Sequence, residues 1–388
     1  QRYNANPPSP SEVTRLDGLA RSVSADSATS LADSAPPMVG STQIFHVLNN
    51  SKDTWSDVTA TLKKTGNSCY IWVVDDSYSE SSTDDRDAKL KPDQINELAD
   101  WFDKIYLAET NLLGYEYGGG LQSTDPDYGG KDHDPKISIL LYDIDGDVTD
   151  TQKTDSGICG YFTGVDYQDA GTFSFLGTSY QSNCMEMFYI DSFFTDSQPQ
   201  MMYSTLIHEF QHMINFNQKC VDPSLSGLES LGAFVNVPTW YNEMLSLMSE
   251  EVIGSSLGIE DKGRPWASWM SAHTWLYSQN GLDTWINDAS HYAQSYAFGT
   301  YLLHNFGGAR ILREMELNSL TGTASVEKAV IDVNGNVVSF ADIYRGYPEV
   351  LLFSAGYQNL GHSFHLSNEW TFNEIKYDCY PLDIGTVE

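Results

Sequence analysis

Residues 208–212 read His-Glu-Phe-Gln-His, a HExxH pattern inside a stretch whose apolar residues are spaced as in a helix. Positions i and i+4 share one face of a helix, so His208 and His212 can present imidazole nitrogens to one metal ion. Glu209 projects beside that ion, where a carboxylate can accept a proton from water. The pattern therefore predicts two metal ligands and one catalytic acid/base.

A simpler explanation of this pattern is a set of polar residues on an exposed helix face. The flanking residues argue against it, because they make the helix apolar on most sides: Leu206, Ile207, Phe210, Met213, Ile214 and Phe216. Buried imidazoles and carboxylates need partners, and one shared metal ion supplies a partner for all of them. We therefore favour a metal site over a solvated helix face.

A catalytic zinc ion usually takes a third protein ligand and keeps one position for water. A third His of the HExxHxxGxxH type is excluded, because Asn215 and Gln218 stand at the Gly and His positions of that motif. Glu243 is the better candidate, since it follows an Asn and lies in an apolar run that is expected to be helical. Glu229 is the competing ligand, and Glu243 could also be a helix N-terminal residue stabilised by the helix dipole.

The HExxH pattern followed by an Asn-Glu pair on a second helix resembles the gluzincin peptidases. More narrowly, the chain resembles the hyicolysin family of secreted bacterial neutral metallopeptidases over about residues 43–320. The segments that carry this resemblance are 140–146, 160–162, 182–191, 208–216 and 240–243. The resemblance implies a secreted zinc endopeptidase with His208, His212 and Glu243 as zinc ligands and Glu209 as catalytic acid/base. Met244 departs from the pattern, because many gluzincins have Gly at this position.

Peptide hydrolysis passes through an oxyanion, which calls for a hydrogen-bond donor besides the metal. Tyr296 is our candidate, since residues 295–302 are similar to the Tyr-containing helix that some gluzincins place over the zinc. His304, two helical turns later, is the alternative. His273 and His291 are expected to be structural. Most of the 23 Tyr are expected to serve packing or the surface, and one of these, directly before the Asn-Glu pair, could lie next to the metal ligands.

Residues 143–147 read Asp-Ile-Asp-Gly-Asp, an oxygen-rich turn that could hold Ca²⁺. It is not an EF-hand, because Thr154 occupies the twelfth loop position, where that motif has a bidentate Glu. The alternative is an ordinary turn after a strand, since Asp-Gly is a common turn pair. Calcium is thus a second possible cofactor beside Zn²⁺.

The formal net charge of −32 argues against nucleic acid and anionic membranes as partners, since both repel an acidic surface. The sequence contains no run of 18 apolar residues, so it predicts no membrane-spanning helix. The chain begins at Gln1 without a basic, apolar leader, as expected for a secreted or cell-surface protein whose leader has been removed. Its five Cys show no CxxC spacing; a Cys159–Cys184 disulfide is favoured, and five buried reduced thiols are the alternative.

The order of the predicted elements indicates an α+β fold, with a zincin-like catalytic domain whose mixed sheet and motif helix precede a mainly helical half. We expect an extended Pro- and Ser-rich arm at 1–42, the metallopeptidase domain at 43–320 and a C-terminal segment at 321–388. Strands are predicted at 44–48, 69–74, 137–143 and 187–190, with a short segment at 58–62 and a helix at 93–106. Further helices are predicted at 240–251, 268–277, 291–305, 309–319, 326–330 and 343–353, and short strands within 361–379.

Two other functions share these motifs. A zinc aminopeptidase would also carry HExxH and the Asn-Glu pair, but the Gly-x-Met-Glu-Asn strand that anchors a substrate amine is absent, and residues 183–187 are only a faint echo of it. A surface binding protein with a structural metal would not need Glu209 as an adjacent base. Protein or peptide substrates are therefore the expected partners, and the oligomeric state is left open.

Overall fold

The computed structural model describes residues 2–3, 36–84, 86–149, 151–153, 155, 157–168, 171–175, 178–220, 237–259, 281–283, 285, 289–353 and 368–380. The chain divides into two compact units. One comprises residues 1–106 and 115–236, and the other comprises residues 107–114 and 237–388. Across the described residues, no helix combines the length and the apolar character needed to cross a membrane.

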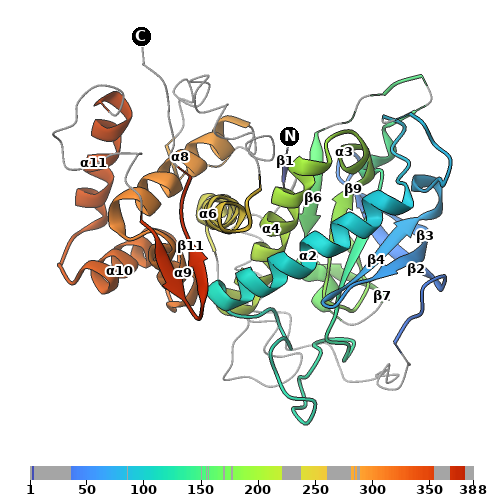
Figure 1. Ribbon diagram of the computed structural model, residues 1–388, viewed down its shortest axis with the longest axis horizontal. Coiled ribbons are helices and arrows are strands. Elements are labelled where there is room, and N and C mark those ends of the chain that lie inside the picture. The colour runs from blue at the N-terminus through green and yellow to red at the C-terminus, as the bar shows by residue number, and fades with distance from the viewer. Residues whose placement is uncertain are drawn as a thin grey trace. The chain divides into compact units, whose positions relative to one another are not determined.

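The first unit is built on a mixed seven-stranded sheet with the strand order β1-β6-β9-β5-β4-β3-β2 (Figure 1). The strands are β1 (Arg2–Tyr3), β2 (Thr42–Asn49), β3 (Thr54–Thr65), β4 (Cys69–Val74), β5 (Ile137–Tyr142), β6 (Ile158–Phe162) and β9 (Met187–Asp191). Strands β4, β5 and β9 run parallel, whereas β2, β3 and β4 form an antiparallel meander. Strand β6 pairs antiparallel with β9, so the predicted mixed sheet is confirmed.

Two long helices, α2 (Pro92–Leu113) and α4 (Pro199–Asn215), cover one face of this sheet (Figure 1). The ring of Phe102 on α2 lies 5.7 Å from that of Phe188 on β9 and 5.3 Å from that of Phe210 on α4. Pro199 stands in the first turn of α4, where its missing N–H costs no hydrogen bond. The short helix α3 (Ser192–Ser197) connects β9 to α4, and the side chain of Asp191 caps it by accepting from the Phe194 N–H at 2.9 Å.

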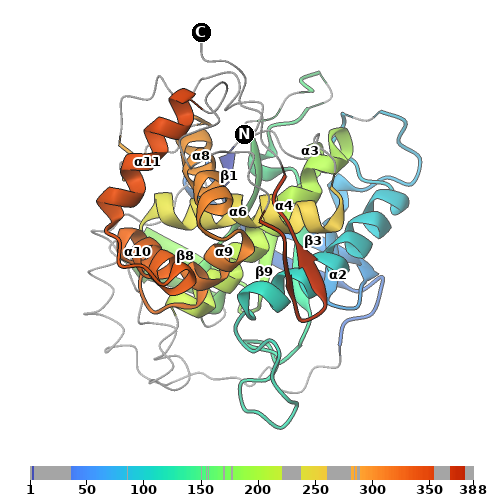
Figure 2. The same cartoon turned by 60° about the vertical axis from the view of Figure 1, so that its left-hand side comes forward.

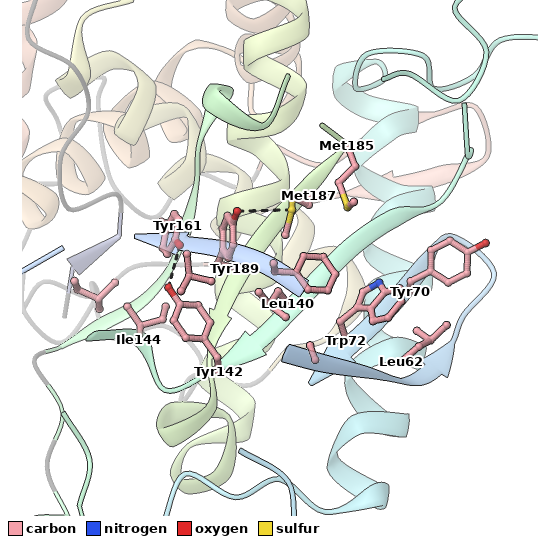
Figure 3. Close-up of a cluster of buried hydrophobic side chains, with 14 residues drawn as sticks. Leu62, Tyr70, Trp72, Leu140, Tyr142, Ile144, Tyr161, Met185, Met187 and Tyr189 are labelled. Carbon is pink, nitrogen blue, oxygen red and sulfur yellow. Dashed lines mark hydrogen bonds between the residues drawn. The ribbon is translucent and has the colours of Figure 1, made fainter. Parts of the chain in front are cut away.

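A second apolar core lies on the opposite face of the sheet (Figure 3). Successive side chains of a strand point to opposite faces, so Phe188 points to the helices while Met187 and Tyr189 point into this core. The hydroxyls of Tyr142 and Tyr161 are hydrogen-bonded at 2.9 Å inside it, and the rings of Tyr161 and Tyr189 stack at 4.2 Å. Both sheet faces are thus buried, which explains why the central strands are almost continuously apolar.

The second unit is mainly helical (Figure 2). Its helices are α6 (Thr239–Leu257), α8 (Ala289–Phe306), α9 (Ala309–Leu317), α10 (Gly322–Asn334) and α11 (Phe340–Phe353). A hairpin of β10 (Trp370–Phe372) and β11 (Ile375–Tyr377) packs against residues 107–114, where the Asn111 amide donates to the Tyr377 hydroxyl at 2.8 Å. The predicted succession of a sheet-bearing half and a helical half is therefore confirmed.

Most predicted elements of the described chain are present, and several are longer than expected. The segment predicted around 58–62 belongs to the twelve-residue strand β3, and the helix predicted at 93–106 extends to Leu113. Strand β6 and the hairpin of β7 (Gly171–Phe175) and β8 (Thr178–Ser182) were not predicted. The predicted helix at 268–277 lies outside the described residues, as do most of the N-terminal arm and the start of 361–379.

Short helical turns complete the described chain: 3₁₀ turns at Asp75–Ser77, Ile144–Gly146 and Gly164–Tyr167, and a π turn at Phe216–Cys220 that continues α4. No two of the five cysteines form a disulfide, so the expected Cys159–Cys184 disulfide was wrong. Cys159 lies in β6 with its side chain fully buried, and burial raises the pKa of its thiol well above the usual value. The four buried cysteines, Cys69, Cys159, Cys184 and Cys379, therefore serve as small apolar core residues, whereas Cys220 is half-buried.

Candidate metal centre

The HExxH residues lie in the middle of α4, a helix whose residues from Met201 to Asn215 are all buried. The side chains of His208 and His212 are 0% and 2% exposed, and their ring centroids are 4.8 Å apart with the planes crossing at 81°. This is the geometry expected for imidazoles one helical turn apart on a shared face. The surrounding apolar side chains exclude the solvated alternative considered from the sequence.

Glu243 joins these two imidazoles. It lies in the first two turns of α6 and is 1% exposed. Ligand atoms of His208, His212 and Glu243 all lie within 4.8 Å of one another, so each can reach the same ion. Two neutral imidazoles and a carboxylate are a donor set that zinc takes with one coordination position left open. The three residues therefore fit zinc in type, number and spacing, as predicted from the sequence.

Glu209, the predicted catalytic acid/base, is fully buried beside these ligands. Strand β6 approaches α4 closely at this point, because its central residue is Gly160. A Cβ atom on Gly160 would lie 3.2 Å from Cγ of Glu209, 3.0 Å from Cγ2 of Thr205 and 2.8 Å from the Tyr189 carbonyl oxygen. Only a residue without a side chain allows β6 to approach Glu209 and its helix this closely.

Comparison with known proteins is consistent with this site. No family model matches the chain. Over 284 residues the chain is 26% identical to the protein named Neutral metalloprotease ShpI from Staphylococcus hyicus.

The chain is a distant homologue of a neutral metalloprotease. The match covers 70% of this chain but only 53% of the staphylococcal protein, so the chain spans about half the length of the relative it matches. The homology and the buried His-His-Glu cluster together confirm the zinc site and the α+β fold that the motifs predicted.

The predicted oxyanion donor, Tyr296, is a buried residue of α8. Its hydroxyl donates to Oε2 of Glu251 at 2.8 Å, and Glu251 follows Glu243 by two turns of α6. The hydroxyl of Tyr241 is held by the Met315 carbonyl and the Ser325 hydroxyl, at 2.9 and 2.7 Å. Tyr241 thus has a structural role, whereas that of Tyr296 stays a prediction.

Of the remaining histidine and glutamate candidates, two lie in the described part of the chain and two lie outside it. His291 and His304 are both buried on α8, and the ring of His291 lies 5.7 Å from that of Trp285. His273 and the competing ligand Glu229 lie outside the described residues. The structure therefore places Glu243 with the two His ligands, and the position of Glu229 is not described.

The acidic turn after β5 is only partly as predicted. Asp143 and Asp147 bring carboxylate oxygens within 4.8 Å of each other and of Asp155, which was not among the candidates. Burial and like charges raise the pKa of Asp143 to about 6 and that of Asp155 to about 7. Asp145 is not in this group, because its carboxylate accepts from the backbone N–H groups of residues 50 and 51 at 2.6 and 3.2 Å.

Proposed function

We propose that the chain is a zinc-dependent endopeptidase that hydrolyses internal peptide bonds of proteins. The observation that carries this proposal is the buried cluster of His208, His212 and Glu243 with Glu209 next to its first ligand. A purely structural metal site has no need of an adjacent buried base. The relative's printed name, a neutral metalloprotease, supports the same class of reaction.

Each side chain has a separate task in this reaction. Bound zinc would polarise the scissile carbonyl group and lower the pKa of water. Glu209 accepts the proton of the attacking water and then transfers it to the leaving amine, as a general acid/base. Burial of the site strengthens these charge interactions, because little water is present to screen them. His208 and His212 act only as ligands, since one helix holds both rings in place.

The partners and the location follow from this proposal. Proteins or peptides are the substrates, and we place the protein outside the cell as a secreted or surface-attached enzyme. The acidic composition fits solubility in that setting. The predicted calcium ion at residues 143–147 stays a prediction, with Asp155 now added to its potential ligands. The division of the chain at residues 42 and 320 also stays a prediction.

The alternative functions are an aminopeptidase and a binding protein with a structural metal. A library of peptides with acetylated N-termini and amidated C-termini separates all three, with mass spectrometry of the products as the measurement. We expect cuts inside the blocked peptides, abolished by a zinc chelator and restored by added zinc. Release of single residues from unblocked peptides alone would establish an aminopeptidase. If the peptides stay intact while one zinc ion is bound per chain, the result would support a binding protein with a structural metal.

The proposed oxyanion role of Tyr296 has its own test. If its hydroxyl donates to the oxyanion, Tyr296→Phe lowers kcat by about 10²-fold with little change in KM. If the hydroxyl serves only Glu251, the substitution lowers the free energy of unfolding by about 1 kcal/mol and leaves kcat unchanged. Tyr301→Phe is a matched control, because the Tyr301 hydroxyl on the same helix donates to the Ile343 carbonyl at 2.9 Å.

A further inference from the structure

The loop between α2 and β5 encloses a small pocket in the first unit (the teal loop below the sheet in Figure 1). Its cavity volume is about 10 Å³, close to the minimum that one water-sized occupant needs. Three carboxylate residues line it, namely Glu116, Asp134 and Glu186. Its other lining residues include no His or Cys, so the pocket offers oxygen ligands.

Two of these carboxylates are almost fully buried. Glu116 is 3% exposed; its Oε1 accepts from the Tyr106 hydroxyl at 2.9 Å, while its Oε2 is buried without a hydrogen-bond partner among the described residues. Glu186 is 4% exposed, and both of its oxygens accept from the Lys131 backbone N–H, at 2.9 and 3.0 Å. The hydroxyl of Tyr167 is likewise buried with no partner in the described chain. Buried polar atoms of this kind are a feature of sites that bind an ion or an ordered water.

The charges around the pocket have one predominant sign. Burial raises the pKa of Glu116 to about 7, and burial together with the carboxylates of Asp132 and Glu116 raises the pKa of Glu186 well above its usual value. Lys136 also lines the pocket, but its ammonium group donates to the carbonyl oxygens of Gly66 and Asn67. A cation bound between the glutamates would lower the pKa of both carboxyl groups, because an opposite charge nearby favours their ionised form.

Glycines bring the loop into contact with both carboxylates. A Cβ atom on Gly119 would lie 2.5 Å from the carboxyl carbon of Glu116, and one on Gly130 would lie 2.2 Å from that of Glu186. A Cβ on Gly118 would lie 2.0 Å from the Gly130 nitrogen. Gly118 and Gly130 also have φ of +78° and +66°, which side-chain-bearing residues rarely adopt. Glycine backbone thus packs directly against the buried carboxyl groups of Glu116 and Glu186.

We propose that this pocket is a calcium site that joins the loop at residues 116–136 to the start of β9. Two groups of three His, Cys, Asp or Glu side chains in the described part of the chain have ligand atoms within 4.8 Å of one another, and the pocket residues are not among them. The ion therefore takes only Glu116 and Glu186 as side-chain ligands and completes its shell with backbone carbonyl oxygens and water. Ca²⁺ accepts such a mixed and irregular oxygen shell, whereas Mg²⁺ requires a near-ideal octahedron.

The first test measures calcium binding without any need for catalysis. Zinc-loaded full-length chain carrying Glu209→Gln, which prevents self-digestion, is dialysed against ⁴⁵Ca²⁺ at up to about 10 mM, a range that includes weak extracellular sites. We expect Glu116→Gln and Glu186→Gln each to remove one bound equivalent. Asp155→Asn, in the separate acidic turn, should retain that equivalent. Each Gln variant should melt at or above the temperature of the parent in calcium-free buffer, because one buried carboxylate has been replaced by a neutral amide.

A second test uses the chain with intact loop residues, so it does not depend on how the variants fold. Trypsin can cut after Lys131, inside the loop, and after the exposed Lys89, outside it. We expect calcium to slow cleavage at Lys131 by at least about tenfold and to leave cleavage at Lys89 unchanged, because bound ligand suppresses only the opening of the loop it holds. Calcium binding that neither Gln substitution reduces, or equal cleavage at Lys131 with and without calcium, would overturn the proposal.

Discussion

Glu209→Gln is expected to lower kcat/KM for peptide cleavage by about 10²–10⁴-fold while one zinc ion per chain stays bound. Glutamine has nearly the same shape as glutamate, so the fully buried side chain keeps its packing. Its amide cannot accept the proton of the attacking water, and it cannot return that proton to the leaving amine. The measurement is the steady-state rate with a blocked fluorogenic peptide, combined with metal analysis of the same sample.

Glu109→Gln is the matched control for this substitution. Glu109 is also fully buried, and burial together with the carboxylates of Glu316 and Glu250 raises its pKa well above the usual value. Glutamine has nearly the same shape as glutamate and adds no charge to this buried group of carboxyls, so activity and zinc content should not change. Full activity of Glu209→Gln with zinc bound would contradict the proposed mechanism. Loss of zinc from that variant would instead assign Glu209 a role in holding the metal.

Glu243→Ala should weaken zinc binding by at least about 10²-fold, because it removes one of the three protein ligands. The apparent activity should then depend on the concentration of added zinc, whereas the parent is saturated at equimolar metal. The melting temperature in the presence of zinc should also fall, since a ligand bound to the folded state stabilises it by mass action. Competition with a chromophoric chelator measures the affinity, and calorimetry measures the melting temperature.

The control for Glu243 is Glu229→Ala, which removes the carboxylate that competed for the same role in the sequence. We expect this variant to bind zinc as tightly as the parent. The reverse pattern, with zinc lost from Glu229→Ala and retained by Glu243→Ala, would transfer the third ligand to Glu229. Equal loss from both variants would indicate that the segment containing Glu229 positions the helix that carries Glu243.

The parts of this protein that could be predicted are those set by local periodicity. His208, Glu209 and His212 were identifiable because an i to i+4 spacing places two side chains on one helix face whatever the rest of the chain does. The central strands were recognised from short apolar runs, since strands buried on both faces lose the polar alternation of surface strands. Glu243 was identifiable for a related reason, as a carboxylate within an apolar helical run.

Strand β6 could not be predicted from local periodicity. Its five residues include a central glycine, which weakens any strand signal, and its conformation depends on pairing with β9. The acidic turn after β5 is a second example. Local spacing suggested Asp143, Asp145 and Asp147, yet backbone N–H groups 94 and 95 residues away engage Asp145, and Asp155 joins the other two. The spacing of the residues indicates neither the backbone contacts of Asp145 nor the approach of Asp155.

The sequence by itself determined the chemistry on α4, because helix geometry links residues only four positions apart. Only the tertiary structure decided which distant groups meet: Glu243 with the two imidazoles, Glu116 with Glu186, and Gly160 against Glu209. The members of each pair are separated by about 30 to 70 residues, so their approach depends on the path of the whole intervening chain. No local rule encodes that path, since it results from the packing of both sheet faces and from the close contacts that glycine allows.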